Sequence, residues 1–189
     1  MTPAVAGLGD RMRAGIARPV AVAEIVRAYV VGALLLGWVG YAAHGWLPAE
    51  LTSGTARGSV APTMAEGMWI LGNNLGFFIL VSLLPVINVL LVAPQFLSLG
   101  GNAFLIQELS FADRVALLYR HSIWEVAALL IAVAMSYALL FAMREYLDRA
   151  TSDTSVLKVR LRLIAWGYPL ILTLTVVGAL LEGNAVVHF

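Results

Sequence analysis

The stretch MWILGNNLGFFILVSLLPVINVLLVAPQFLSLGGNAFLI, residues 68–106, has no charged side chain and is about 40 residues long. A transmembrane helix needs about 20 mostly apolar residues to cross a hydrocarbon core about 30 Å thick. The stretch is therefore too long for one crossing. Pro85 removes a backbone donor and clashes with the preceding turn. The sequence thus predicts two helices, Trp69–Leu84 and Val86–Ile106, that form a tight Pro-broken hairpin.

Three more apolar runs of span length lie outside this stretch. One precedes it, Ala28–Leu47, and two follow it, Ile123–Met143 and Leu163–Leu181. The first run exceeds the apolar core of about 7–15 residues that a secretory signal carries, so we interpret it as a retained anchor. The sequence therefore predicts an all-α, polytopic membrane protein with about five transmembrane helices.

The composition agrees with a chain that lies in a lipid bilayer. Hydrophobic residues make up 61% of the 189 residues and charged residues 12%, against about 25% charged in soluble domains. The net charge of +1 gives no basic surplus for nucleic acid. The chain has no Cys, which excludes disulfides, thiol nucleophiles and cysteine metal sites.

The Lys and Arg residues near the span ends predict the orientation, because these residues favour the cytoplasmic side. They gather before the first span and between the fourth and fifth, at Arg11, Arg13, Arg18, Arg27, Arg144, Arg149, Lys158, Arg160 and Arg162. Five spans place both groups on one side, whereas four would separate them. We therefore expect a cytoplasmic N-terminal segment, 1–27, a single transmembrane domain, 28–182, and an external tail, 183–189.

Polar side chains within the spans need internal partners or water, because hydrocarbon cannot hydrogen-bond them. In the predicted orientation, six of them lie toward the external ends of four spans: Asn73, Asn74, Asn102, His121, Glu125 and Glu182. Asn88 is the exception, near the inner turn. The sequence therefore predicts one polar layer near the external face.

Within this layer, His121 and Glu125 are four residues apart and so share one helix face. Three interpretations are open: hydrogen bonds that tie helix ends together, a proton or ligand relay, and a metal or hydrolytic centre to which Glu182 adds an oxygen. The pair is one ligand short of the His-Glu-x-x-His pattern of zinc proteases. We predict no metal and no cofactor; in an enzyme, the catalytic residues would be His121, Glu125 and Glu182.

Glycines mark places where helices can approach closely. Gly72 and Gly76 form a Gly-x-x-x-Gly pattern, which is typical of helix contacts in membranes. Gly100 and Gly101 are expected to interrupt the third span next to Asn102.

Four separated motifs occur in order along the chain: Asn73-Asn74, Gly100-Gly101-Asn102, His121-Ser122-Ile123-Trp124-Glu125 and Ala179-Leu180-Leu181-Glu182. With these motifs, residues 68–184 resemble the stage II sporulation protein M family of integral membrane proteins. The family commonly has His-Gly-x-x-Glu in the fourth span, where this chain has Ser122 in place of Gly.

The resemblance implies a non-enzymatic subunit of a complex in the bacterial inner membrane. Members of the family work in sporulation or in bacteriocin-like peptide maturation, export or self-protection. The implied partners are other membrane proteins, such as an ABC transporter ATPase or peptide-processing proteins, and a second copy of the chain as a homo-oligomer. Two alternatives stay open: an intramembrane hydrolase or cyclase, and a small transporter or immunity protein.

Overall fold

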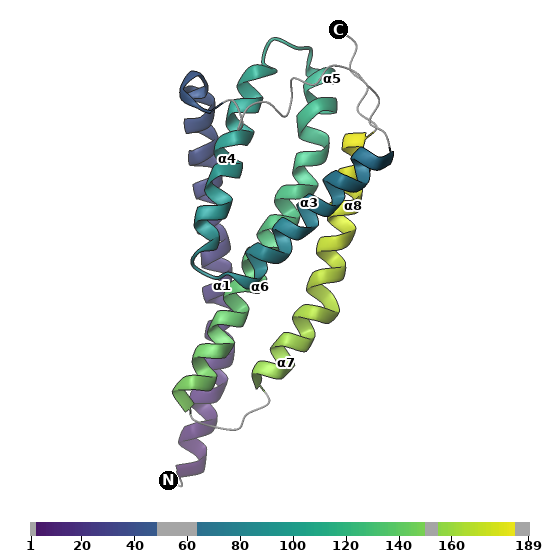
Figure 1. Ribbon diagram of the computed structural model, residues 1–189. Coiled ribbons are helices and arrows are strands. Elements are labelled where there is room, and N and C mark those ends of the chain that lie inside the picture. The colour runs from purple at the N-terminus through teal and green to yellow at the C-terminus, as the bar shows by residue number, and fades with distance from the viewer. Residues whose placement is uncertain (1–2, 49–63, 150–154, 184–189) are drawn as a thin grey trace.

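The computed structural model describes residues 3–48, 64–149 and 155–183, and all regular elements in these ranges are helical. Figure 1 shows an elongated bundle in which α3 runs obliquely across the other helices. The longer helices are α1 (Pro3–Ala42), α3 (Met64–Leu83), α4 (Asn88–Leu105), α6 (Arg120–Arg149) and α8 (Tyr168–Gly183). The shorter elements are η1 (His44–Trp46), α5 (Phe111–Arg114), α7 (Ser155–Arg162) and two π-helical turns, η3 (Val115–Tyr119) and η4 (Leu163–Gly167).

Four helical segments of the described chain are long and apolar enough to cross a membrane: Ala21–Ala42, Asn88–Leu105, Arg120–Arg144 and Lys158–Leu181. The apolar part of α3, Met68–Leu83, is shorter and rises about 24 Å at 1.5 Å per residue. The prediction that the regular elements are all helical is therefore confirmed for the described residues, and four of these helices have the length and apolar character that a membrane span requires. The fifth span stays a prediction, because α3 alone falls short of the hydrocarbon thickness.

The break at Pro85 lies where the sequence predicts it. Helix α3 ends at Leu83 and α4 begins at Asn88, and the amide of Asn88 donates to the carbonyl of Leu84 at 3.0 Å. Beyond this tight turn the two helices diverge: α4 packs along α1, whereas α3 packs against α6 and α8 (Figure 1). The predicted tight connection beside Pro85 is therefore present, although the two helices that it joins pack mainly against different neighbours.

The turn holds Val86 in a left-handed backbone conformation, with φ at 70°. A β-branched residue there costs about 1–2 kcal/mol, which glycine avoids. We expect Val86→Gly to raise the free energy of unfolding by about 1 kcal/mol, measured by thermal unfolding in detergent. Val89→Gly, at an exposed position inside α4, is the matched control and should lower it by about 0.5 kcal/mol. Equal changes in the free energy of unfolding for the two variants would show that the backbone at Val86 is not strained.

Two glycines, Gly40 and Gly100, bring α1 and α4 together. They are not the glycines of the Gly-x-x-x-Gly pattern, Gly72 and Gly76. A Cβ on Gly40 would lie 2.1 Å from the carbonyl oxygen of Leu97, and one on Gly100 would lie 1.9 Å from that of Gly37. Helix α4 continues through Gly100, so the predicted interruption is wrong: here glycine serves close approach of two backbones. By contrast, a Cβ on Gly72 or Gly76 would meet nothing within 4 Å in the described structure.

The core of the bundle lies where α3, α4, α6 and α8 converge. It is formed by buried residues such as Val81, Val92, Val133 and Ile171. Asn88, which is fully buried, accepts a hydrogen bond from the hydroxyl of Tyr29 and donates one to Ser136 at 3.4 Å. Asn88, which the sequence places outside the predicted polar layer, therefore links α4 to α1 and to α6.

Candidate functional site

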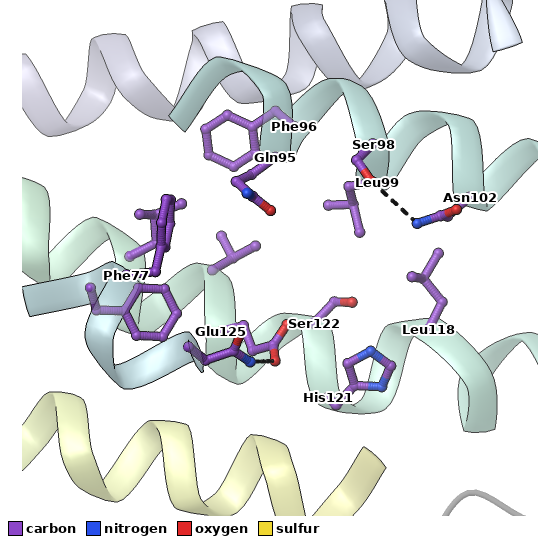
Figure 2. Close-up of a pocket in the computed structure, with 14 residues that line it drawn as sticks. Phe77, Gln95, Phe96, Ser98, Leu99, Asn102, Leu118, His121, Ser122 and Glu125 are labelled. Carbon is purple, nitrogen blue, oxygen red and sulfur yellow. Dashed lines mark hydrogen bonds between the residues drawn. The ribbon is translucent and has the colours of Figure 1, made fainter. Parts of the chain in front are cut away.

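A pocket of about 170 Å³ lies between α3, α4 and α6. Figure 2 shows its side chains converging from these helices. We call it the polar pocket, because among its lining residues are seven with polar side chains: Asn74, Gln95, Ser98, Asn102, His121, Ser122 and Glu125. Aromatic and aliphatic side chains complete the lining. Its volume is about that of five to six water molecules in the liquid, which is enough for one small polar group of a ligand.

Glu125 is half-buried and is held by a residue from another helix. The side-chain amide of Asn74 on α3 donates a hydrogen bond to its Oε1 at 2.5 Å. On its other side, α8 approaches closely at Gly178, where an added Cβ would lie 3.4 Å from the Cγ of Glu125. The carboxylate is therefore positioned by α3 and α8 as well as by its own helix.

His121 lies one turn before Glu125 and is 8% exposed. Its Nδ1 is buried and has no hydrogen-bond partner within the part of the chain that the structure describes. In Figure 2 its ring lies at the end of the pocket near Leu118 and Asn102, while Glu125 reaches toward α3. A buried nitrogen of this kind is rare in proteins and calls for a specific explanation, such as a bound ligand.

The amide of Asn102 completes the same end of the pocket. It is half-buried, and its Nδ2 donates to the Oγ of Ser98 at 3.4 Å, one turn earlier on α4. The lining also includes Gln95, on the same face of α4. The spacing of Gln95, Ser98 and Asn102, at i, i+3 and i+7, is a signal that could have identified the first two from the sequence.

The structure brings four of the six predicted site residues to one pocket: Asn74, Asn102, His121 and Glu125. Asn73 is exposed and is not among the lining residues. Glu182 belongs to the last turn of α8, and its side chain lies outside the described residues. The neighbouring carbonyl of Leu181 accepts a hydrogen bond from Nη2 of Arg120 at 2.7 Å, which ties the end of α8 to the start of α6.

Two short elements precede α6: the helix α5, which has a capped N-terminus, and the π-helical turn η3. Ser110 caps α5, since its Oγ accepts from the amide of Asp113 at 3.2 Å. The π-helical turn η3 follows, with the amide of Arg120 bonded to the carbonyl of Val115. One extra residue in a turn rotates all later side chains by about 100° around the helix axis. Such turns are frequent at functional sites, and this one ends immediately before His121.

The pocket offers several hydrogen-bonding groups, a carboxylate and an imidazole, next to apolar walls. Such a set can bind and orient a polar group. Among the described residues, no group of three or more His, Cys, Asp and Glu side chains is placed to hold a metal ion. A search of protein-family models, curated proteins and solved structures found no match to this chain.

Proposed function

We propose that this protein is a non-enzymatic subunit of a membrane protein complex and that its polar pocket binds a polar group of an amphiphilic client. The observation that carries the proposal is the buried Nδ1 of His121, which has no partner within the described chain and lies in a pocket lined by polar residues. A partner for this nitrogen supplied by another molecule would complete the site. Binding, rather than chemical conversion, is the role that this geometry favours.

The position of Glu125 argues against a catalytic pair. In a catalytic pair, a second side chain orients the general base through a hydrogen bond. For Glu125 to play this role, its carboxylate must face the imidazole ring of His121. Here the Oε1 of Glu125 accepts a hydrogen bond from Asn74 on α3, whereas the Nδ1 of His121 has no hydrogen-bond partner within the described residues. The hydrolase or cyclase alternative is therefore less well supported than a binding role.

The exposed face of α3 supports the assignment to a complex. Gly72 and Gly76 leave this face open, with no atom of the described structure within 4 Å of an added Cβ. In membranes such a face allows a second helix to approach closely. The resemblance of the sequence suggests the partner: an ABC-type ATPase or a peptide-processing protein. A second copy of the chain could use the same face.

The proposal places the protein in a bacterial inner membrane, with its N-terminus in the cytoplasm and its C-terminus outside. The distribution of Lys and Arg supports this orientation. This orientation requires α3 to be a fifth span. Although α3 is short, it packs against both α6 and α8, so neighbouring helices cover part of its surface.

Photo-crosslinking in native membranes tests the proposal. We expect a photoreactive residue at Gly76 to cross-link to one distinct membrane protein, identified by mass spectrometry. The same residue at Leu34, which is 71% exposed on α1, is the matched control and should react mainly with lipid. Deletion of the captured protein should abolish the cellular function of this chain. Only lipid adducts at both positions, with a monomeric and functional protein, would contradict the proposal.

A further inference from the structure

We propose that the helix α7 and the turn after it bind the headgroup of an anionic phospholipid. The site is formed by Lys158, Arg160 and Arg162 on α7 together with Trp166 in η4, and we call these four residues the basic surface. None of them lines the polar pocket. The inference therefore concerns a different part of the molecule from the proposed function and a different kind of ligand.

The basic surface carries a positive charge that its own helix does not neutralise. The sequence of α7, SVLKVRLR, has three basic side chains and no acidic one. All three basic side chains are exposed, and none is hydrogen-bonded or ion-paired to another described residue. The longer connection, residues 144–162, is also net positive, with five basic and three acidic side chains. The phosphate of an anionic headgroup complements such a cluster of Lys and Arg beside a membrane span.

The basic surface lies at the end of an apolar segment of membrane-spanning length. The segment Lys158–Leu181 has this length and composition, and residues 163–181 carry no charged side chain. Trp166 lies four residues after Arg162, about 6 Å further along the helix axis. The polar interface of a bilayer is about 5–8 Å thick on each side. Arg162 at the level of the phosphates therefore puts Trp166 at the edge of the hydrocarbon, where indole rings are enriched.

The π-helical turn η4 follows α7 directly and packs closely on α6. A Cβ on Gly167 would lie 2.5 Å from the Sδ of Met135 on α6. The neighbouring Trp166 is instead 77% exposed, and Leu161 and Ile164 are more than half exposed. Exposed indole and aliphatic side chains therefore lie next to the basic ones along the chain, as a lipid with acyl chains beside its headgroup requires.

A phospholipid suits this surface better than a soluble acidic protein. A single phospholipid molecule offers both an anionic headgroup and apolar chains, whereas a soluble acidic protein matches only the basic side chains. In the proposed orientation α7 lies on the cytoplasmic side, and the anionic lipids of the cytoplasmic leaflet attract basic segments beside a span. The inference needs no knowledge of the protein partner.

Quenching of Trp166 fluorescence by brominated lipids tests the inference on the full chain in phosphatidylcholine vesicles. The vesicles contain brominated phosphatidylglycerol or, at the same mole fraction, brominated phosphatidylcholine. Trp166 is made the only fluorescent tryptophan by replacing the other four with Phe: Trp38, Trp46, Trp69 and Trp124. We expect the binding constant at Trp166 to be at least about fivefold higher for phosphatidylglycerol, the effect of about one basic residue near anionic lipid.

Variants of this single-tryptophan chain show whether the basic side chains cause the preference. Lys158→Gln combined with Arg162→Gln should bring the ratio of the two binding constants close to one. Arg160→Gln alone should lower the ratio by a smaller factor, and it keeps the test informative if the double variant does not fold, which circular dichroism shows. Arg27→Gln is the matched control: Arg27 is also exposed but is ion-paired with Glu24, and the ratio should stay unchanged.

Equal quenching of Trp166 by the two brominated lipids would overturn the inference, as would an unchanged ratio in the double variant. Soluble poly-glutamate tests the other class of partner. If it alters Trp166 emission in vesicles without anionic lipid, while the two brominated lipids quench equally, the surface binds an acidic peptide and the lipid inference is wrong. A chain that keeps Trp46 as its only tryptophan, at the end of α1 opposite α7 (Figure 1), should show no preference.

Discussion

Gly100→Ala is expected to destabilise the protein by about 3 kcal/mol or more, at the upper end of overpacking effects. The new Cβ would lie 1.9 Å from the carbonyl oxygen of Gly37 and 2.9 Å from the amide nitrogen of Tyr41. Both atoms belong to the backbone of α1, so no side-chain rotation can relieve the clash. Helix α1 must move away from α4 along the contact that joins them. Unfolding of the detergent-solubilised protein, followed by circular dichroism, measures the loss.

Gly76→Ala is the matched control, because an added Cβ there meets no atom within 4 Å. In a helix, alanine is favoured over glycine by about 0.5–1 kcal/mol, so this variant should be slightly more stable than the wild-type protein. Gly40→Ala, with a contact of 2.1 Å to the carbonyl oxygen of Leu97, should behave like Gly100→Ala. Similar stability of the Gly100 and Gly76 variants would show that α1 and α4 do not pack as described.

Asn88→Leu is expected to lower the free energy of unfolding by about 2–4 kcal/mol. The substitution removes the acceptor of the hydroxyl of Tyr29, which is half-buried, and the donor to Ser136, which is fully buried. Each buried polar group left without its partner costs about 1–3 kcal/mol. Tyr29 keeps a contact of 3.4 Å with the hydroxyl of Tyr137, which limits the loss on that side. Chemical unfolding of the detergent-solubilised protein gives the value.

Asn73→Leu makes the same chemical change at an exposed position of α3. We expect its stability to stay within about 0.5 kcal/mol of the wild-type value, as is usual for surface substitutions. The comparison separates the buried hydrogen bonds of Asn88 from the general effect of replacing an amide by an apolar side chain. Equal losses in the two variants would show that the Asn88 network contributes little.

Much of the fold follows from local properties of the chain. The apolar runs around residues 28–47, 123–143 and 163–181 become long helices, and the chain breaks beside Pro85. Each of these outcomes depends on a single segment: its length, its apolar character and its missing backbone donor. Charge and hydropathy also placed Asn74, Asn102, His121 and Glu125 at similar heights, and the structure brings them to one pocket.

Other features depend on how helices are rotated and which of them meet. Adjacent residues on a helix differ by about 100° in direction, so Asn74 lines the pocket while Asn73 is exposed. The π-helical turn η3 changes the rotation of side chains just before His121. The pattern at Gly72 and Gly76 predicts a close contact, yet within the described structure that contact is made at Gly40 and Gly100.

The sequence alone determined the helical class, the apolar segments, the break at Pro85 and the residue types of the pocket, because each depends on how one segment interacts with lipid. The tertiary structure decided that α4 packs along α1, that α3 turns toward α8, and that Asn74 holds Glu125. In an apolar solvent, hydrophobicity does not distinguish one helix pairing from another. Shape complementarity at glycines and a few hydrogen bonds between distant residues select the arrangement.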